Sequence, residues 1–145
     1  MQSQFDTDKY SSYSYSVDGK PIPLMRARAS GSRFYDSQKN LKLIWGIEIR
    51  NQKEHDIFDC PLLIDMTFYF PFPQKKTKQV IRENDYFAHI PDIDNCIKFV
   101  LDAGTGLLWT DDRLIVGINA LKYYGALPRT QFTLYCLKEF NECHS

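Results

Sequence analysis

The stretch from Pro91 to Gly104 constrains the fold more than any other, because it predicts one amphipathic helix. Its apolar residues recur at the spacing of a single buried helical stripe: Ile93, Ile97, Val100 and Leu101. Proline lacks a backbone N–H and belongs at the edge of an element, so the helix is predicted to begin between Asp92 and Asp94. Gly104 is a natural C-terminal stop, and the apolar stripe requires a core to pack against.

A second stripe of the same predicted helix is polar and consists of Asp94, Lys98 and Asp102. Asp92 lies two residues before Asp94, so the two carboxylates can converge on one ion only if Asp92 precedes the helix. Carboxylates held this close repel each other unless a cation lies between them. Mg²⁺ commonly binds one or two carboxylates and a substrate phosphate, so metal-dependent phosphodiester chemistry is the first hypothesis.

An alternative interpretation gives the same residues ordinary structural roles. An Asp at a helix start is most often only an N-cap, and Asp94 with Lys98 can form a plain surface ion pair. An EF-hand is excluded, because its loop would need an oxygen ligand where Cys96 stands and a glycine where Ile97 stands.

After a short glycine-containing turn, the predicted helix is followed by residues 109–112, Trp-Thr-Asp-Asp. Together with residues 91–103, this segment resembles the signature of the RusA family of Holliday-junction resolvases, P-D-x-D-N-x-x-K-x-x-x-D-A followed by W-x-D-D and a strand. Weaker likenesses lie in the loop at residues 19–23 with its trailing arginines, and in residues 122–125 and 128–130. The likeness covers about residues 13–137.

The resemblance implies an α/β (α+β) single domain with a mixed β-sheet and two main helices. It further implies a homodimeric, Mg²⁺-dependent endonuclease, with Mn²⁺ as a possible substitute, that resolves four-way DNA junctions by two symmetric cuts. Such cuts leave 5′-phosphate and 3′-hydroxyl ends. A nuclease for flaps or other branched DNA, and a catalytically silent DNA-binding module, remain as alternatives.

The resemblance also implies the roles of individual residues. Asp92, Asp94 and Asp112 correspond to the acidic metal-binding set, and Asp112 rather than Asp111 matches the second-strand aspartate. Lys98 corresponds to the positive catalytic residue, which offsets charge developing on the phosphoryl oxygens. Weaker expectations for phosphate contacts are Arg26, Arg28, Lys75, Lys76, Lys122 and Arg129.

The net charge of zero conceals strong patterning. Residues 18–53 include eight basic and three acidic side chains, and residues 71–82 include four basic and no acidic ones. Residues 83–112, in contrast, include seven acidic and one basic. Basic segments that hold phosphates beside an acidic pocket suit a metal-dependent nuclease, although charge runs are usually solvated faces.

Alternating apolar and polar residues predict four strands, at about 13–17, 62–70, 114–118 and 129–137. Residues 40–51 alternate like a strand and contain Gly46, whereas the resemblance implies a helix there. We favour the helix, because the flanking segments suit a crossover element. Residues 1–10 are polar and predicted to be disordered, which leaves 11–145 as the endonuclease domain.

The 145 residues, 43% of them hydrophobic, suffice for one core. No apolar run approaches the roughly 18 residues that a membrane span needs, and the polar start is unlike a signal peptide. We therefore expect a soluble, cytoplasmic protein. The four cysteines, Cys60, Cys96, Cys136 and Cys143, are too widely spaced for a zinc knuckle. Cys96 and Cys136 fall in predicted apolar faces, so we expect them to be reduced thiols in the core.

Overall fold

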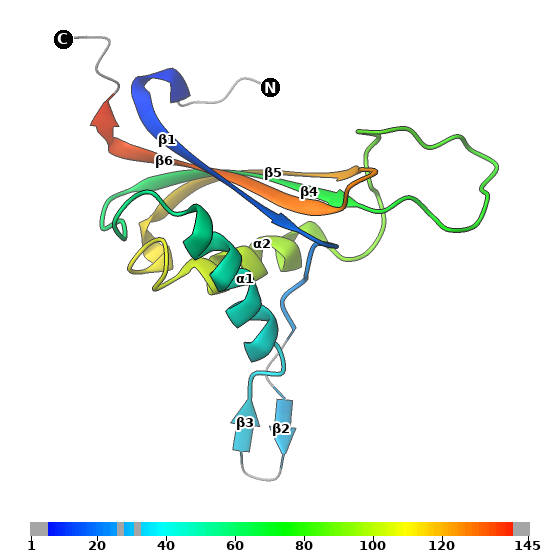
Figure 1. Ribbon diagram of the computed structural model, residues 1–145, viewed down its shortest axis with the longest axis horizontal. Coiled ribbons are helices and arrows are strands. Elements are labelled where there is room, and N and C mark those ends of the chain that lie inside the picture. The colour runs from blue at the N-terminus through cyan, green and yellow to red at the C-terminus, as the bar shows by residue number, and fades with distance from the viewer. Residues whose placement is uncertain (1–5, 26–27, 31–32, 141–145) are drawn as a thin grey trace.

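A four-stranded sheet forms the centre of the protein, and two helices cover one of its faces (Figure 1). The computed structural model describes residues 6–25, 28–30 and 33–140, with the backbone alone at 28–30, 33–35, 139 and 140. The strand order is β1-β6-β4-β5, with these bounds: β1 Tyr10–Asp18, β4 Leu62–Phe70, β5 Ile115–Tyr124 and β6 Arg129–Phe140. β4 pairs parallel to β5 and antiparallel to β6, so the predicted α+β domain with a mixed sheet is confirmed.

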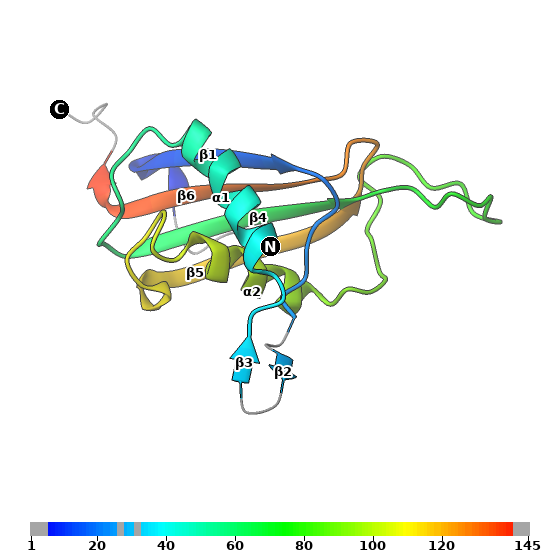
Figure 2. The ribbon, with the colours of Figure 1, turned by 60° about the horizontal axis from the view of Figure 1, so that its bottom comes forward.

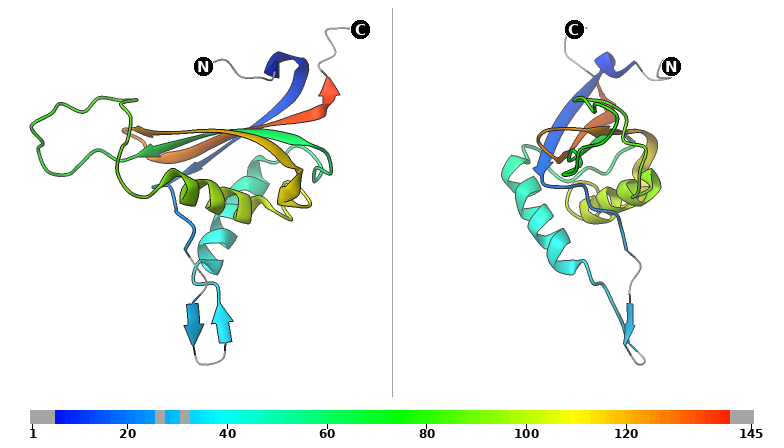
Figure 3. Two further views of the ribbon diagram at one scale, coloured as in Figure 1. Left: turned by 180° about the vertical axis from the view of Figure 1, so that it is seen from behind. Right: turned by 90° about the vertical axis from the view of Figure 1, so that its right-hand side faces the viewer.

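The two helices, α1 (Lys39–Gln52) and α2 (Ile93–Gly104), lie on the same side of the sheet (Figure 2, Figure 3). α2 connects β4 with β5, because parallel neighbours in a sheet cannot be joined by a hairpin. It begins and ends where the sequence predicts. α1 confirms the helical interpretation of residues 40–51, and the strand alternative is wrong.

The core lies between the helices and the sheet. Trp45 of α1 stacks on Phe132 of β6 with ring centroids 5.6 Å apart, and meets Phe99 of α2 edge-on at 5.9 Å. The inward side chains of β4 are all buried: Leu62, Ile64, Met66, Phe68 and Phe70. This packing ties α2 to the sheet, so the start of α2 rests on a rigid support.

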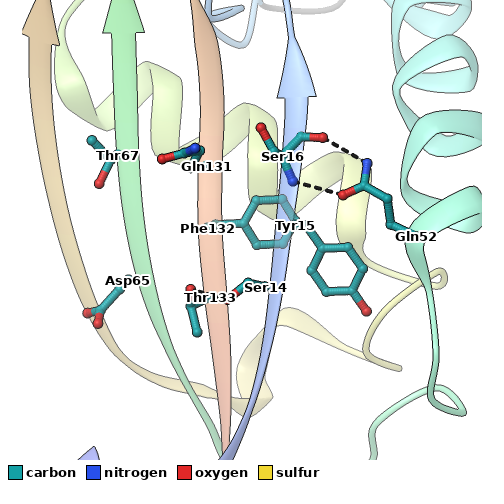
Figure 4. A pocket seen from close by; sticks show the side chains of 9 residues that line it. All are labelled: Ser14, Tyr15, Ser16, Gln52, Asp65, Thr67, Gln131, Phe132 and Thr133. Carbon is teal, nitrogen blue, oxygen red and sulfur yellow. Dashed lines mark hydrogen bonds between the residues drawn. The ribbon is translucent and has the colours of Figure 1, made fainter.

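The other face of the sheet bears an open pocket lined largely by polar side chains (Figure 4). Its lining comes from three strands and α1: Ser14, Tyr15, Ser16, Gln52, Asp65, Thr67, Gln131, Phe132 and Thr133. The Gln52 amide accepts a hydrogen bond from the N–H of Ser16 (2.9 Å) and donates one to its carbonyl (2.8 Å). These bonds occupy main-chain groups of edge strand β1, which protects the edge from pairing with another strand.

Two segments project beyond the sheet (Figure 1). β2 (Arg28–Ser30) and β3 (Arg33–Tyr35) form a small antiparallel hairpin that the sequence analysis did not predict. Residues 71–92, between β4 and α2, include the basic run at 71–82 and extend past the end of the sheet.

At the N-terminus, Thr7–Lys9 form a 3₁₀ turn that leads directly into β1, while residues 1–5 lie outside the described residues. The predicted disorder of residues 1–10 stays a prediction.

No helix in the described chain has the length and apolar character needed to cross a membrane. Cys96 and Cys136 are buried in the core, as predicted, and Cys143 lies beyond the description.

Candidate active site at the start of α2

Asp92 occupies the N-cap position of α2, with an extended backbone (φ −64°, ψ 145°). Its main-chain carbonyl accepts the N–H groups of Asn95 (3.2 Å) and Cys96 (3.4 Å), which starts the helix. Its carboxylate, however, makes no capping hydrogen bond to the first turn and is exposed. The ordinary role of an N-cap aspartate therefore does not explain this side chain.

Asp94 and Lys98 lie one helical turn apart on the exposed side of α2. The Lys98 ammonium is 3.8 Å from the Asp94 carboxylate, and the side chains are 59% and 64% exposed, respectively. An exposed pair of this kind contributes about 0–1 kcal/mol, so it does not fix either group in place.

Asp112 lies in the 3₁₀ turn Asp112–Leu114, which leads directly into β5. The start of β5 lies near the C-terminal end of α2, away from its first turn (Figure 2). α2 has 12 residues, which makes it about 18 Å long. β5 then runs back beside the helix, and only near its end does Lys122 reach the carbonyl of Pro91. Within one chain, therefore, the structure brings Asp92, Asp94 and Lys98 together but leaves Asp112 far from them.

The neighbouring Asp111 has a local structural role. Its carboxylate accepts the N–H of Arg113 (2.9 Å) and caps the 3₁₀ turn, and it also pairs with the Arg113 side chain (3.6 Å). Asp112 is exposed and is not the capping residue. The choice of Asp112 over Asp111 as a metal ligand stays a prediction.

The donor atoms at the start of α2 fit a hard divalent cation. Asp92 and Asp94 offer carboxylate oxygens, and Mg²⁺ or Mn²⁺ commonly binds to one or two of these with water completing its shell. Burial raises the pKa of the Cys96 thiol to about 11, against the opposing charge of Lys122. In the described residues of a single chain, no group of three His, Cys, Asp or Glu side chains is arranged to hold a metal ion.

Comparison with known proteins decides the family. The family model described as "Endodeoxyribonuclease RusA" matches residues 18–135. The chain belongs to the RusA family. A relative from Bacillus subtilis (strain 168), named "Uncharacterized protein YqaN", is 26% identical over 129 residues, which cover 81% of this chain and 91% of that protein. RusA-family membership supports an endodeoxyribonuclease, and the match includes Asp92, Asp94, Lys98 and Asp112.

In this RusA-family chain, Lys122 supports the segment that enters α2. Its ammonium donates hydrogen bonds to the main-chain carbonyls of His89 (2.6 Å) and Pro91 (2.7 Å). Its own carbonyl accepts the N–H of Phe87 (3.0 Å). The sequence placed Lys122 among the phosphate contacts, since nothing in the pattern indicates that β5 runs beside residues 87–91.

A second segment meets the first turn of α2. The N–H of Leu24 donates to the carbonyl of Asn95 (2.8 Å), which brings residues 19–25 of the RusA-like loop beside the site. Gln38, only 3% exposed, holds this loop through Pro23 (2.8 Å) and Met25 (2.9 Å). Sequence reasoning missed Gln38, because a glutamine next to a helix start is indistinguishable from an ordinary surface residue.

The other predicted phosphate contacts lie on different segments of the RusA-family domain. Lys75 and Lys76 are exposed on the projecting segment 71–92. The Arg129 guanidinium lies 3.7 Å from the centroid of the Tyr69 ring and donates to the carbonyl of Leu127 (2.8 Å). Arg26 lies outside the described residues, and Arg28 is described only by its backbone in β2. Of these residues, the structure describes the side chains of Lys75, Lys76 and Arg129.

Proposed function

We propose that this protein is a Mg²⁺-dependent endodeoxyribonuclease that resolves four-way DNA junctions by paired strand cuts, with Mn²⁺ able to replace Mg²⁺. The observation that carries the proposal is the pair of exposed carboxylates at the start of α2, where the Asp92 side chain does not cap the helix. Mg²⁺ bound there would polarise the scissile phosphodiester and lower the pKa of a bound water.

The residues of the chain perform separate tasks in this proposal. Asp92 and Asp94 hold the cation through their carboxylate oxygens. Lys98, one turn later on the same side of α2, stabilises negative charge that develops on the phosphoryl oxygens. The weak pairing of Lys98 with Asp94 suits this task, because the ammonium can leave the carboxylate at little cost in free energy.

The position of Asp112 supports a homodimer. Mg²⁺ ligands lie about 2 Å from the ion, and within one chain the length of α2 separates Asp112 from Asp92. We therefore propose that a second copy of the chain supplies Asp112 to each site. A four-way junction has two-fold symmetry, so two equivalent sites related by the same operator would cut it symmetrically.

Basic side chains would hold the arms of the junction through their phosphates. Lys75 and Lys76 are the strongest candidates, because they are exposed on a segment that projects from the domain and carries no acidic residue between 71 and 82. Arg26, Arg28 and Arg129 remain further candidates. Lys122 is left out of this set, because its ammonium bonds two main-chain carbonyls.

The test compares end-labelled four-way, flap and linear duplex DNA, each with Mg²⁺ and with EDTA. We expect paired, symmetric nicks on the four-way DNA in Mg²⁺ and no cutting in EDTA. Flap cleavage as fast as junction cleavage would favour the general branched-DNA nuclease. Junction binding without cutting in Mg²⁺ or Mn²⁺ would favour the silent binding module.

A further inference from the structure

Lys122 links β5 to the residue that immediately precedes Asp92. Its ammonium donates to the carbonyl of Pro91 at 2.7 Å and to the carbonyl of His89 at 2.6 Å. Hydrogen bonds from a charged donor are shorter and stronger than neutral ones. The side chain is half-buried, so water competes only in part for these carbonyls.

The bond to Pro91 acts on Asp92 through the peptide plane. The carbonyl of Pro91 and the N–H of Asp92 belong to one planar unit, so fixing the direction of the carbonyl also fixes the N–Cα bond of Asp92. On its other side, Asp92 is held by the first turn of α2 through its own carbonyl. The extended Asp92 backbone, which keeps its carboxylate away from the capping position, is therefore held from both sides.

The same lysine anchors the beginning of this segment. Its carbonyl accepts the N–H of Phe87 (3.0 Å), and its ammonium lies 5.4 Å from the centroid of the Phe87 ring. That ring stacks on Phe70 of β4, with centroids 4.1 Å apart. Residues 87–91 are thus fastened at both ends to the rigid sheet by a single side chain and its backbone.

We propose that Lys122 is a positioning residue for the metal-binding carboxylate of Asp92, and not a phosphate contact. The inference rests on the proposed function, because it assumes that Asp92 binds a divalent cation. Residues that orient a metal ligand typically affect metal affinity by about 10–100-fold. Loss of Lys122 should therefore weaken cation binding more than DNA binding.

The test uses Lys122→Met, which keeps an unbranched apolar stem but removes the donors and the charge, and Lys122→Arg, which retains both. Exposed Lys138 of β6 supplies the matched control, Lys138→Met. Three quantities are measured: Mn²⁺ affinity by titration calorimetry, amide exchange of residues 87–96 without metal, and junction affinity in EDTA. Junction cleavage is then followed against Mg²⁺ concentration.

For Lys122→Met we expect Mn²⁺ affinity to fall by about tenfold or more, with faster amide exchange at residues 87–96. Cleavage should require a correspondingly higher Mg²⁺ concentration, while junction affinity in EDTA stays within about twofold of wild type, as it would if no phosphate contact is lost. Lys122→Arg should restore most of the metal affinity, and Lys138→Met should match the wild type.

Wild-type Mn²⁺ affinity in Lys122→Met, together with weakened junction binding, would overturn the inference and make Lys122 a DNA contact. Unchanged values in every measurement would also overturn it. If Lys122→Met does not fold, Lys122→Leu, which also lacks the donors and the charge, carries the same comparison. A wild-type protein that neither binds Mn²⁺ nor cuts junctions would instead refute the proposed function itself.

Discussion

Asp92 and Asp94 stand two residues apart and differ in their position relative to α2. Asp92 precedes the helix with an extended backbone, whereas Asp94 lies in its first turn and faces Lys98. This arrangement agrees with the argument from the sequence that the two carboxylates can share an ion only if Asp92 stays outside the helix. Short spacings of this kind are accessible from the sequence, because local backbone geometry alone decides them.

Replacement of Asp94 tests the proposed metal site. Asp94→Asn removes a ligand charge, so we expect cleavage of four-way DNA to be abolished, while junction binding in EDTA stays intact or tightens because repulsion of phosphate falls. Asp102→Asn is the matched control, since Asp102 lies two turns along the same stripe and pairs with Lys42 of α1. Full cleavage by Asp94→Asn would remove Asp94 from the site.

Lys98→Ala separates catalysis from electrostatic anchoring. Loss of a charge that stabilises the transition state should lower the single-turnover cleavage rate by about tenfold or more, with little change in junction affinity. The alternative role of Lys98, an exposed ion pair with Asp94, predicts a change in unfolding free energy below about 1 kcal/mol and normal turnover. Rapid-quench kinetics with urea denaturation of the same variant distinguishes the two roles.

At the scale of elements, α1 shows where pattern alone is ambiguous. Its apolar residues alternate along the sequence, but only Trp45 and Ile49, one turn apart, are buried, and Leu43 and Ile47 are 58% and 56% exposed. Few residues of this helix point inward, and its exposed apolar side chains produce an alternating pattern that resembles a strand. Strands β1, β4 and β6 and helix α2, in contrast, were predictable, because their buried apolar residues follow one regular period.

The glycines of the two helices should respond oppositely to alanine. At Gly104 a Cβ atom would lie 2.5 Å from the buried indole of Trp109, so Gly104→Ala should lower the unfolding free energy by about 1–3 kcal/mol. At Gly46 a Cβ meets only Leu107, at 3.7 Å, so Gly46→Ala should raise it by about 0.5–1 kcal/mol through helix propensity. Urea denaturation measures both, and destabilisation by Gly46→Ala would contradict this account.

At the scale of the whole molecule, the sequence could not show which distant segments meet. Lys122 beside Pro91, and residues 19–25 beside Asn95, depend on strand order and crossover geometry that no local pattern reveals. The same limit applied to Asp112, which the resemblance assigned to one metal set with Asp92. The fold places them at opposite ends of α2.

The proposed sharing of sites between two copies can be tested with mixed dimers. Asp92→Asn and Asp112→Asn should each be inactive alone. If Asp112 acts across the dimer, a mixed dimer has one doubly altered site and one wild-type site, so mixing the two variants should restore cutting at one strand of a four-way junction. Mixtures that stay inactive, although subunit exchange is shown by differential tagging, would contradict the sharing of each site between two copies.

The separation of Asp112 from Asp92 also makes activity depend on how much protein is present. If each site needs residues from two copies, a lone chain is harmless to DNA, and the specific activity must fall steeply once dilution dissociates the dimer. The length of α2 would thus act as a safeguard for the genome: low expression produces silent monomers, and cutting begins only when two chains assemble.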